Sequence, residues 1–130
     1  MQTDRRIALL CSCVLALLAI PAYAVDRVHA GQWETSANTA GRTRGHSACL
    51  SQAEADAMNG DAASIRAVME KQFGGACTVK DVKVKGGQVV LTSLCGGKEL
   101  VSTTEYHGDS YDSVSSNGST VQAKRVGACK

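Results

Sequence analysis

The residue types that could carry out hydrolysis stand close together in one short segment. His107, Asp109 and Ser110 are the three types of a catalytic triad, in which an imidazole held by a carboxylate activates a serine hydroxyl. A triad depends on a geometry that neighbouring loop residues rarely reach, and the sequence has no Gly-x-Ser-x-Gly elbow. His46, beside Ser47, is the other histidine on which a small hydrolase could depend. We therefore predict that the protein is not an enzyme and has no catalytic residue, and we retain a hydrolase that uses His107 or His46 as an alternative.

Metal binding is the second kind of chemistry that these residues allow. His29, His46 and His107 would hold an ion only if the fold brought two or three of them together. The cysteines lie too far apart in the sequence to form the short hooks of zinc sites or a redox Cys-x-x-Cys motif. The sequence also lacks a phosphate-binding loop and a dinucleotide-binding motif. We expect no metal and no cofactor.

The start of the chain has the three parts of a secretory signal peptide. Arg5 and Arg6 form a positive start, residues 7–20 are an uncharged apolar run, and a small-x-small cleavage pattern ends at Ala24. The apolar run is shorter than the roughly 18 residues that a membrane span needs. We therefore predict a signal peptide over residues 1–24, cleavage after Ala24 and no stable membrane anchor. The mature chain, residues 25–130, would be a single domain in the bacterial periplasm.

Two of the six cysteines, Cys11 and Cys13, would leave with the signal peptide. The other four predict two structural disulfides, because exported chains meet an oxidising compartment: Cys49, Cys77, Cys95 and Cys129. Three pairings are possible. We prefer Cys49–Cys77, which would join the helical segment to the sheet, together with Cys95–Cys129, which would tie the last strand to the middle of the sheet.

Alternating and turn-forming residues predict mostly strands. A first strand starts at Gly31 with Trp33 as its core anchor, a turn-rich segment carries Arg42 and Arg44, and a short second strand follows from about Thr43 to Cys49. Glycine pairs and Asn117-Gly118 then separate five candidate strands: Cys77–Lys85, Gln88–Cys95, Lys98–His107, Ser110–Ser116 and Thr120–Ala128. A hairpin at Gly86-Gly87 would pair Val84 with Val89 and Val82 with Leu91. Residues 110–116 hold few apolar side chains, so we expect an edge or solvated strand there.

Helical signals fill the segment between the second and third strands. Ser51 and Glu54 form a capping box, Asn59-Gly60 interrupts the helix, and Asp61 can cap a second one. The second helix carries one apolar stripe: Ile65, Val68, Met69 and Phe73. We therefore expect an α+β fold, in which a twisted antiparallel β-meander of five to six strands packs on a helical segment and two disulfides brace it.

Composition and charge exclude some classes of partner. The 130-residue chain has a formal net charge of +2 and 4% aromatic residues, which argues against nucleic-acid binding. Lys80, Lys83 and Lys85 are best explained as the solvated edge of a hairpin. Their alternative role is contact with an anionic partner such as a polysaccharide or a phospholipid headgroup, which Arg42 and Arg44 could join.

Several landmarks together resemble a known family. They are Gly31-Gln32-Trp33-Glu34, Cys49-Leu50 at the start of a helical stretch, Cys77, Cys95 and the segment Tyr106-His-Gly-Asp-Ser-Tyr111. With them the chain resembles the domain-of-unknown-function family 3617 of small exported proteobacterial proteins. The resemblance implies export, disulfides and a small α+β domain, and it carries over no activity and no site residue.

These observations favour an exported periplasmic protein that binds or assists without catalysis. Its ligand is unknown, and the two candidates are an envelope protein and a small apolar molecule held between the sheet and the helix. The small periplasmic hydrolase and a structural component of the cell envelope remain as alternatives.

Overall fold

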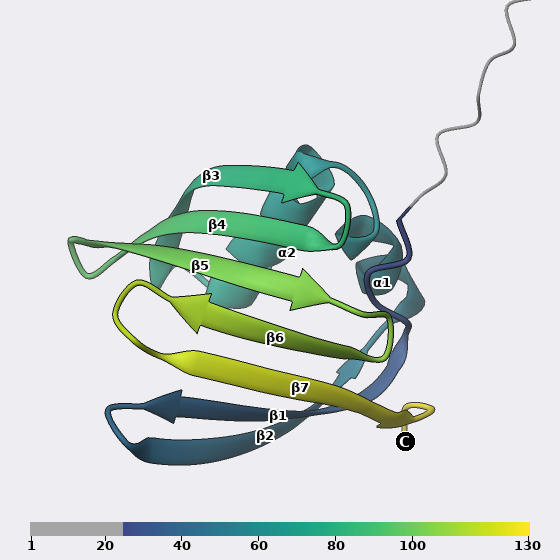
Figure 1. Cartoon of the computed structure of the whole chain (residues 1–130). Helices are drawn as coiled ribbons and strands as arrows, with labels where there is room; N and C mark the ends of the chain where they lie inside the picture. The colour runs from purple at the N-terminus through teal and green to yellow at the C-terminus, as the bar shows by residue number, and fades with distance from the viewer. Residues whose placement is uncertain (1–24) are drawn as a thin grey trace, which may run out of the picture.

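The computed structural model describes residues 25–130, in which one antiparallel sheet carries two helices on one face (Figure 1). The expected signal peptide lies outside the described residues. The elements in chain order are β1 (Gly31–Thr39), β2 (Arg42–Leu50), α1 (Gln52–Met58), α2 (Ala62–Phe73), β3 (Cys77–Lys85), β4 (Gln88–Cys95), β5 (Lys98–Tyr106), β6 (Ser110–Ser115) and β7 (Thr120–Gly127). The α+β class and the antiparallel sheet are confirmed.

The strand order explains why the helices lie where they do. The seven strands are arranged as β2-β1-β7-β6-β5-β4-β3, so the meander from β3 to β7 is extended by the β1–β2 hairpin. The two edge strands, β2 and β3, are consecutive in the chain apart from α1 and α2. The helical segment must therefore cross from one edge of the sheet to the other, and it packs on one face as it does so (Figure 1). We call this the inner face.

The turn between β1 and β2 is tighter than the sequence suggested. Ala40 and Gly41 have φ angles of 51° and 77°, the left-handed conformation that a two-residue hairpin turn requires at both positions. Pairing consequently continues to the last pair, Thr39 with Arg42. The expected turn-rich segment is therefore shorter than predicted, since Arg42 and Arg44 both belong to strand β2, which extends one residue beyond the expected strand at each end.

Strand β6 is the second correction. It pairs with β5 on one side and with β7 on the other, so it is an interior strand and not an edge. The strand resembled an edge in sequence because serines, and not apolar residues, occupy its half-buried positions 113 and 115. These two serines are hydrogen-bonded to Ser102 and Thr104 of β5. Local sequence could not show these contacts, because they join different strands.

The helices begin and end where local signals predict. The Ser51 hydroxyl accepts from the Glu54 amide and the Glu54 carboxylate accepts from the Ser51 amide. Asp61 caps α2, and Gly74 ends it in the left-handed conformation at φ 55°. Of the helices in the described part of the chain, neither has the length and apolar character to cross a membrane.

The core lies between α2 and the β3–β4 half of the sheet. Ile65 and Val68 from α2 are buried against Val79, Val82 and Val89. The predicted register is confirmed, because Val84 pairs with Val89 and Val82 with Leu91. Trp33 is 5% exposed, as expected for a core anchor.

The first turn of the described chain is built into this core. Arg27 is only 4% exposed. Its Nε donates to the carbonyl of Gly86 at 2.8 Å, and its Nη1 donates to the carbonyls of Met58 and Gly60 at 3.0 and 2.9 Å. The guanidinium is thereby satisfied by backbone oxygens, and it ties the chain before β1 to the α1–α2 junction and the β3–β4 turn.

Both disulfides form, but the preferred pairing was wrong. The bridges are Cys49–Cys129 and Cys77–Cys95. Cys77 and Cys95 are directly opposite across β3 and β4. The ends of β2 and β7 flank the start of β1, where Gln32 pairs with Cys49 on one side and with Gly127 on the other. Both bridges thus join segments that the sheet already places together, whereas Cys49–Cys77 would have had to span the helical segment.

Candidate functional site

A groove of about 750 Å³ lies between the inner face of the sheet and the helices. That volume falls within the range of about 300–1,000 Å³ that is usual for small-ligand sites. The groove has a simple geometric cause. A helix about 10 Å wide covers roughly two strands spaced about 4.8 Å apart, and α2 packs over the β3 side of a seven-stranded sheet (Figure 1). The inner face beyond β4 is therefore not covered by α2.

The α2 side of the groove is apolar. Met69 and Phe73 come from the second half of α2, and Leu91 and Leu100 come from β4 and β5. Met69, Phe73 and Leu91 are only partly buried. Such flexible and aromatic side chains can adapt to an alkyl or ring ligand without exposing polar groups.

An aromatic row closes one end of the groove. Trp33, Tyr111 and Tyr106 come from β1, β6 and β5, with ring centroids 5.6 Å apart for the first pair and 5.3 Å for the second. The Trp33 indole N–H donates to the carbonyl of His29 at 3.0 Å. Burial raises the pKa of the Tyr106 hydroxyl well above its ordinary value, so this hydroxyl stays uncharged.

Hydroxyl groups line the floor of the groove in cross-strand pairs. The hydroxyls of Ser102 and Ser115 lie 2.8 Å apart, and Thr104 donates to Ser113 at 2.9 Å. Throughout residues 25–130, no buried side-chain nitrogen or oxygen lacks a hydrogen-bond partner. The floor therefore carries polar but uncharged hydroxyl groups that are hydrogen-bonded to one another. They need no hydrogen bond from a ligand.

Sequence comparison assigns the chain to a family. Residues 28–129 match the model of a family described as a protein of unknown function, DUF3617. The chain belongs to this family. Comparison with curated proteins and with solved structures found no match.

The DUF3617 match spans every element that builds the groove, from β1 to β7. Both disulfides also lie within the matched residues. Because disulfides persist in oxidising environments, they suggest that this DUF3617 protein works outside the cytoplasm.

The residues of the candidate triad do not assemble in this DUF3617 domain. The Asp109 carboxylate is hydrogen-bonded to Nδ1 of His29 at 2.7 Å and not to the ring of His107. In the described part of the chain, the carboxylate nearest to His107 is that of Asp112, whose Oδ2 lies 3.9 Å from Nε2, which is too far for a hydrogen bond. Ser110 forms the backbone turn, in which its carbonyl accepts from the amide of His107.

The three histidines also remain apart. His29 lies between two carboxylates, with Nε2 at 2.7 Å from Asp26 and Nδ1 at 2.7 Å from Asp109. The hydrogen bond to Asp109 and, to a smaller extent, the hydrogen bond to Asp26 raise the pKa of His29 above its usual value. His46 lies on β2 at the border of the groove. Within the described range no three His, Cys, Asp or Glu side chains are grouped so as to hold a metal ion.

Sequence reasoning missed the groove-lining hydroxyls and the His29–Asp109 pair. The hydroxyls were visible as Ser102 and Thr104 in one strand and Ser113 and Ser115 in the next, each pair spaced by two. That spacing puts each pair on one face of its strand, but the sequence did not show which face. His29 and Asp109 are 80 positions apart, and no local signal connects them.

Proposed function

We propose that this protein is exported to the periplasm, loses residues 1–24 by cleavage after Ala24, and binds an apolar small molecule there without catalysis. The groove between α2 and the inner face is the observation on which the proposal rests. It combines the volume, concave shape and apolar lining of a small-ligand site with a neutral, satisfied floor. Cleavage after Ala24 would keep Arg27 and its buried hydrogen bonds in the mature protein.

The arrangement of acidic and basic groups supports binding over hydrolysis. Asp109 is hydrogen-bonded to His29, and the carboxylate nearest to His107, that of Asp112, lies 3.9 Å away. His46 stands on an edge strand at the border of the groove. Among the described residues, neither histidine has a carboxylate hydrogen-bonded to its ring, as the imidazole of a serine hydrolase triad does.

Mass spectrometry of the protein recovered from the periplasm of its host tests the binding proposal. Native spectra should show a mass above that of the polypeptide, and denaturing spectra should lose it. Thr35→Phe places a bulky ring in the groove and should abolish the extra mass. Ser36→Phe places the same ring on the opposite face of β1 and should retain it. Ser113→Phe provides a second blocking variant on β6.

The opposite results are also informative. An unliganded mass in wild-type protein and in both β1 variants would contradict the proposal. So would an envelope protein that co-purifies equally with wild-type and Thr35→Phe protein, because its contact would then lie outside the groove.

Export is tested separately by fractionation and N-terminal sequencing. We expect the mature protein in the periplasmic fraction, beginning at Val25, with no thiol that reacts with an alkylating reagent before reduction. A full-length precursor in the cytoplasm with four reactive thiols among residues 25–130 would contradict this part of the proposal.

A further inference from the structure

Building on the proposed function, we propose that the ligand is a single-chain anionic amphiphile of the fatty-acid type. Its alkyl chain would lie along α2, and its carboxylate would contact Arg42 and Arg44 of β2. Three features of the described residues carry this inference: the segregation of charge between the two faces of the sheet, the position of the arginines relative to the groove, and the neutrality of the groove between its ends.

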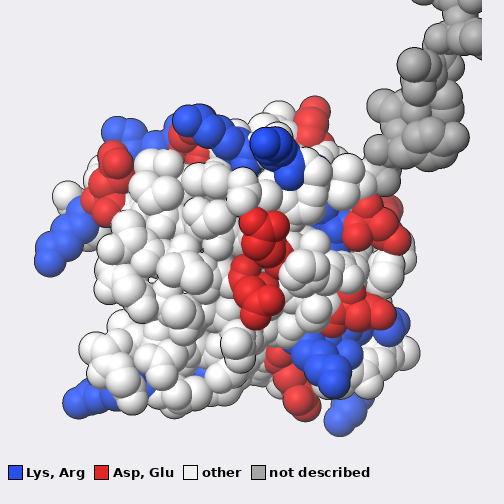
Figure 2. All heavy atoms as spheres, in the orientation of Figure 1, with Lys and Arg blue, Asp and Glu red and all other residues white. Residues whose placement is uncertain are grey.

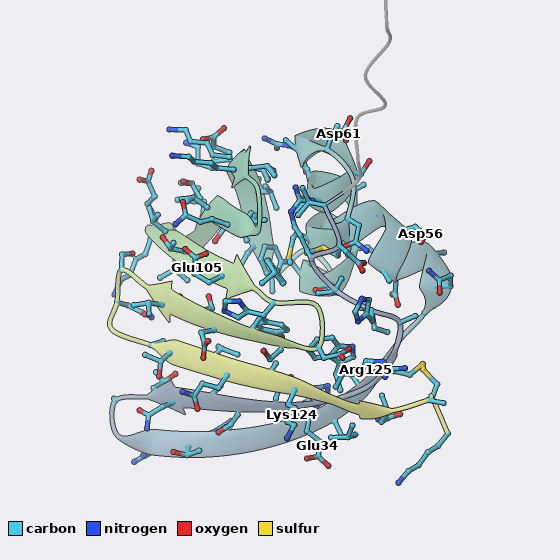
Figure 3. The ribbon with its side chains drawn as sticks, turned by 45° about the vertical axis from the view of Figure 1, so that its right-hand side comes forward. Glu34, Asp56, Asp61, Glu105, Lys124 and Arg125 are labelled. Atoms are coloured by element: carbon cyan, nitrogen blue, oxygen red, sulfur yellow. A yellow bond between two sulfur atoms is a disulfide. The ribbon has the colours of Figure 1, made fainter. Side chains whose placement is uncertain are left out.

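Every acidic residue within the seven strands lies on the outer face. Strand alternation and register put all five there: Glu34, Asp81, Glu99, Glu105 and Asp112. Figure 2 views this face and shows acidic side chains gathered over the middle of the sheet, around β5 and β6. Figure 3 shows Glu34 beside Lys124, its partner across β1 and β7. The inner face of the strands therefore carries no carboxylate that would repel an anion.

Basic residues, in contrast, do occur on the inner face. Arg42 and Arg44 share a face of β2 with His46, which lines the groove. Lys98, opposite Cys95 at the start of β5, is on the same face. All three stand at the end of the sheet that holds the β1–β2 and β4–β5 turns (Figure 1). The inner face at this end is therefore positively charged.

The sheet register brings Arg44 into line with the groove. Arg44 pairs with Ala37, Ala37 pairs with Val121, and Val121 pairs with Ser113. Val121 and Ser113 both line the groove. Arg44 is thus two strands, or about 10 Å, from Val121 in the same transverse row, and its long side chain can reach toward the groove end. Arg42 is the next inner-face residue of β2 in the direction of the β1–β2 turn.

Three other charged side chains near the aromatic end of the groove are already engaged: Arg27 and Arg125, whose guanidinium groups donate to backbone carbonyls, and Glu54. Glu54 lies near the α1 end, where its carboxylate accepts from the Ser51 amide and hydroxyl at 3.0 Å each. The hydrogen bond from the Ser51 amide, followed by that from its hydroxyl, lowers the pKa of Glu54. A ligand with one anionic end therefore has one favoured orientation, with its head at the arginines of β2 and its chain toward Phe73 and the aromatic row.

Calorimetric titration with matched ligands tests the inference on delipidated full-length mature protein. Laurate carries a charge and monolaurin has the same alkyl chain with a neutral head. We expect laurate to bind about tenfold more tightly than monolaurin, the scale of two partly exposed ion pairs. Each methylene added to the fatty acid should tighten binding by up to about fourfold while the groove has room.

Charge-removal variants locate the head of the ligand. Arg42→Gln/Arg44→Gln should reduce laurate affinity to that of monolaurin and leave monolaurin binding unchanged. Lys83→Gln/Lys85→Gln removes the same charge from the outer face of edge strand β3 and should leave laurate affinity within about twofold, since more distant exposed charges are screened by salt. A brominated acyl chain should quench Trp33, the sole tryptophan, in wild-type protein.

The possible failures separate the two proposals. Equal binding of laurate and monolaurin, unaffected by Arg42→Gln/Arg44→Gln, would overturn the anionic ligand and leave apolar binding standing. Failure of both ligands to bind or to quench Trp33 would overturn both proposals. A stable dimer in sedimentation that excludes laurate would instead assign the groove to a second copy of the chain, and it too would overturn both.

Discussion

At the scale of single residues, Asn59 does more than end helix α1. Its Oδ1 accepts from the amides of Arg27 and Val28 at 2.8 and 2.9 Å, and its Nδ2 donates to the carbonyl of Val28 at 2.8 Å. The sequence predicted a helix break at Asn59-Gly60, and that prediction is confirmed. It could not predict that the amide would hold a segment more than thirty positions away, because nothing local in the sequence records that contact.

Replacing Asn59 with Ala should lower the free energy of unfolding by about 2–3 kcal/mol. The change leaves two backbone amides and one carbonyl without their partner in a partly buried place, and each unsatisfied group carries a desolvation cost. Asn38→Ala is the control, because its amide makes one exposed contact with Thr43 at 3.2 Å, and it should cost less than about 0.5 kcal/mol. Urea denaturation measures both, and equal losses would contradict the role given to Asn59.

His29 should make stability depend on pH. Its folded-state pKa is raised above 6.5 by Asp109 and Asp26, so the protonated ring stabilises the folded protein. That contribution is fully present below the unfolded-state pKa of about 6.5 and is lost as pH rises through the higher folded value.

We therefore expect the free energy of unfolding of wild-type protein to fall as pH rises above about 6.5, and this fall to be smaller in His29→Gln. His107→Gln should keep the His29 contribution. Denaturant titrations at several pH values measure the slopes, and an NMR titration of the His29 ring should give a pKa above 6.5. If the free energy of unfolding depended on pH identically in wild-type and His29→Gln protein, the stabilisation of protonated His29 by Asp26 and Asp109 would be contradicted.

At the scale of elements, the Cys77–Cys95 bridge depends on a strand register that the sequence predicted only in part. The Gly86-Gly87 hairpin fixed the register of Val84 with Val89 correctly. Continued without interruption, that register would set Cys77 opposite Gly96. The structure has a shift between Val79 and Asp81 that brings Cys77 opposite Cys95. A β-bulge of this kind adds one residue to one strand, and no residue type near Val79 indicates it in the sequence.

The two disulfides should contribute unequally to stability. Their sequence separations are 18 for Cys77–Cys95 and 80 for Cys49–Cys129. Because the longer loop restricts the unfolded chain more, its removal should cost about 4.5 kcal/mol, against about 3 kcal/mol for the shorter loop. Paired Cys→Ala variants compared by denaturant unfolding measure the difference. A larger loss from Cys77→Ala/Cys95→Ala would contradict this ranking.

At the scale of the whole molecule, local signals predicted nearly every element but not their order in the sheet. The five strands from β3 to β7 follow from glycine turns and alternating residues, and both helices follow from Ser51, Asp61 and the apolar stripe of α2. The docking of β1 against β7 depends on contacts between distant segments, and it places β7, the last strand of the meander, in the interior of the sheet.

The groove could not be predicted for the same reason. It exists because one helix covers part of a wide sheet, and its floor is recognisable only after β5, β6, β7 and β1 are placed side by side. The sequence did suggest a small apolar ligand between sheet and helix, and the structure supplies a space of suitable size there. The sequence predicted a turn-rich segment at Arg42 and Arg44, whereas the register places both on the inner face of β2.

Contacts between ligand and protein methyl groups test the central claim most directly. In isotope-filtered NMR spectra of the protein with bound laurate, we expect nuclear Overhauser effects from the alkyl chain to the inner-face methyl groups of Leu91, Leu100 and Val121. None should reach Val90, Val101 or Val114, which alternate with them on the outer face. Contacts to the outer-face methyl groups alone would contradict a binding site in the groove.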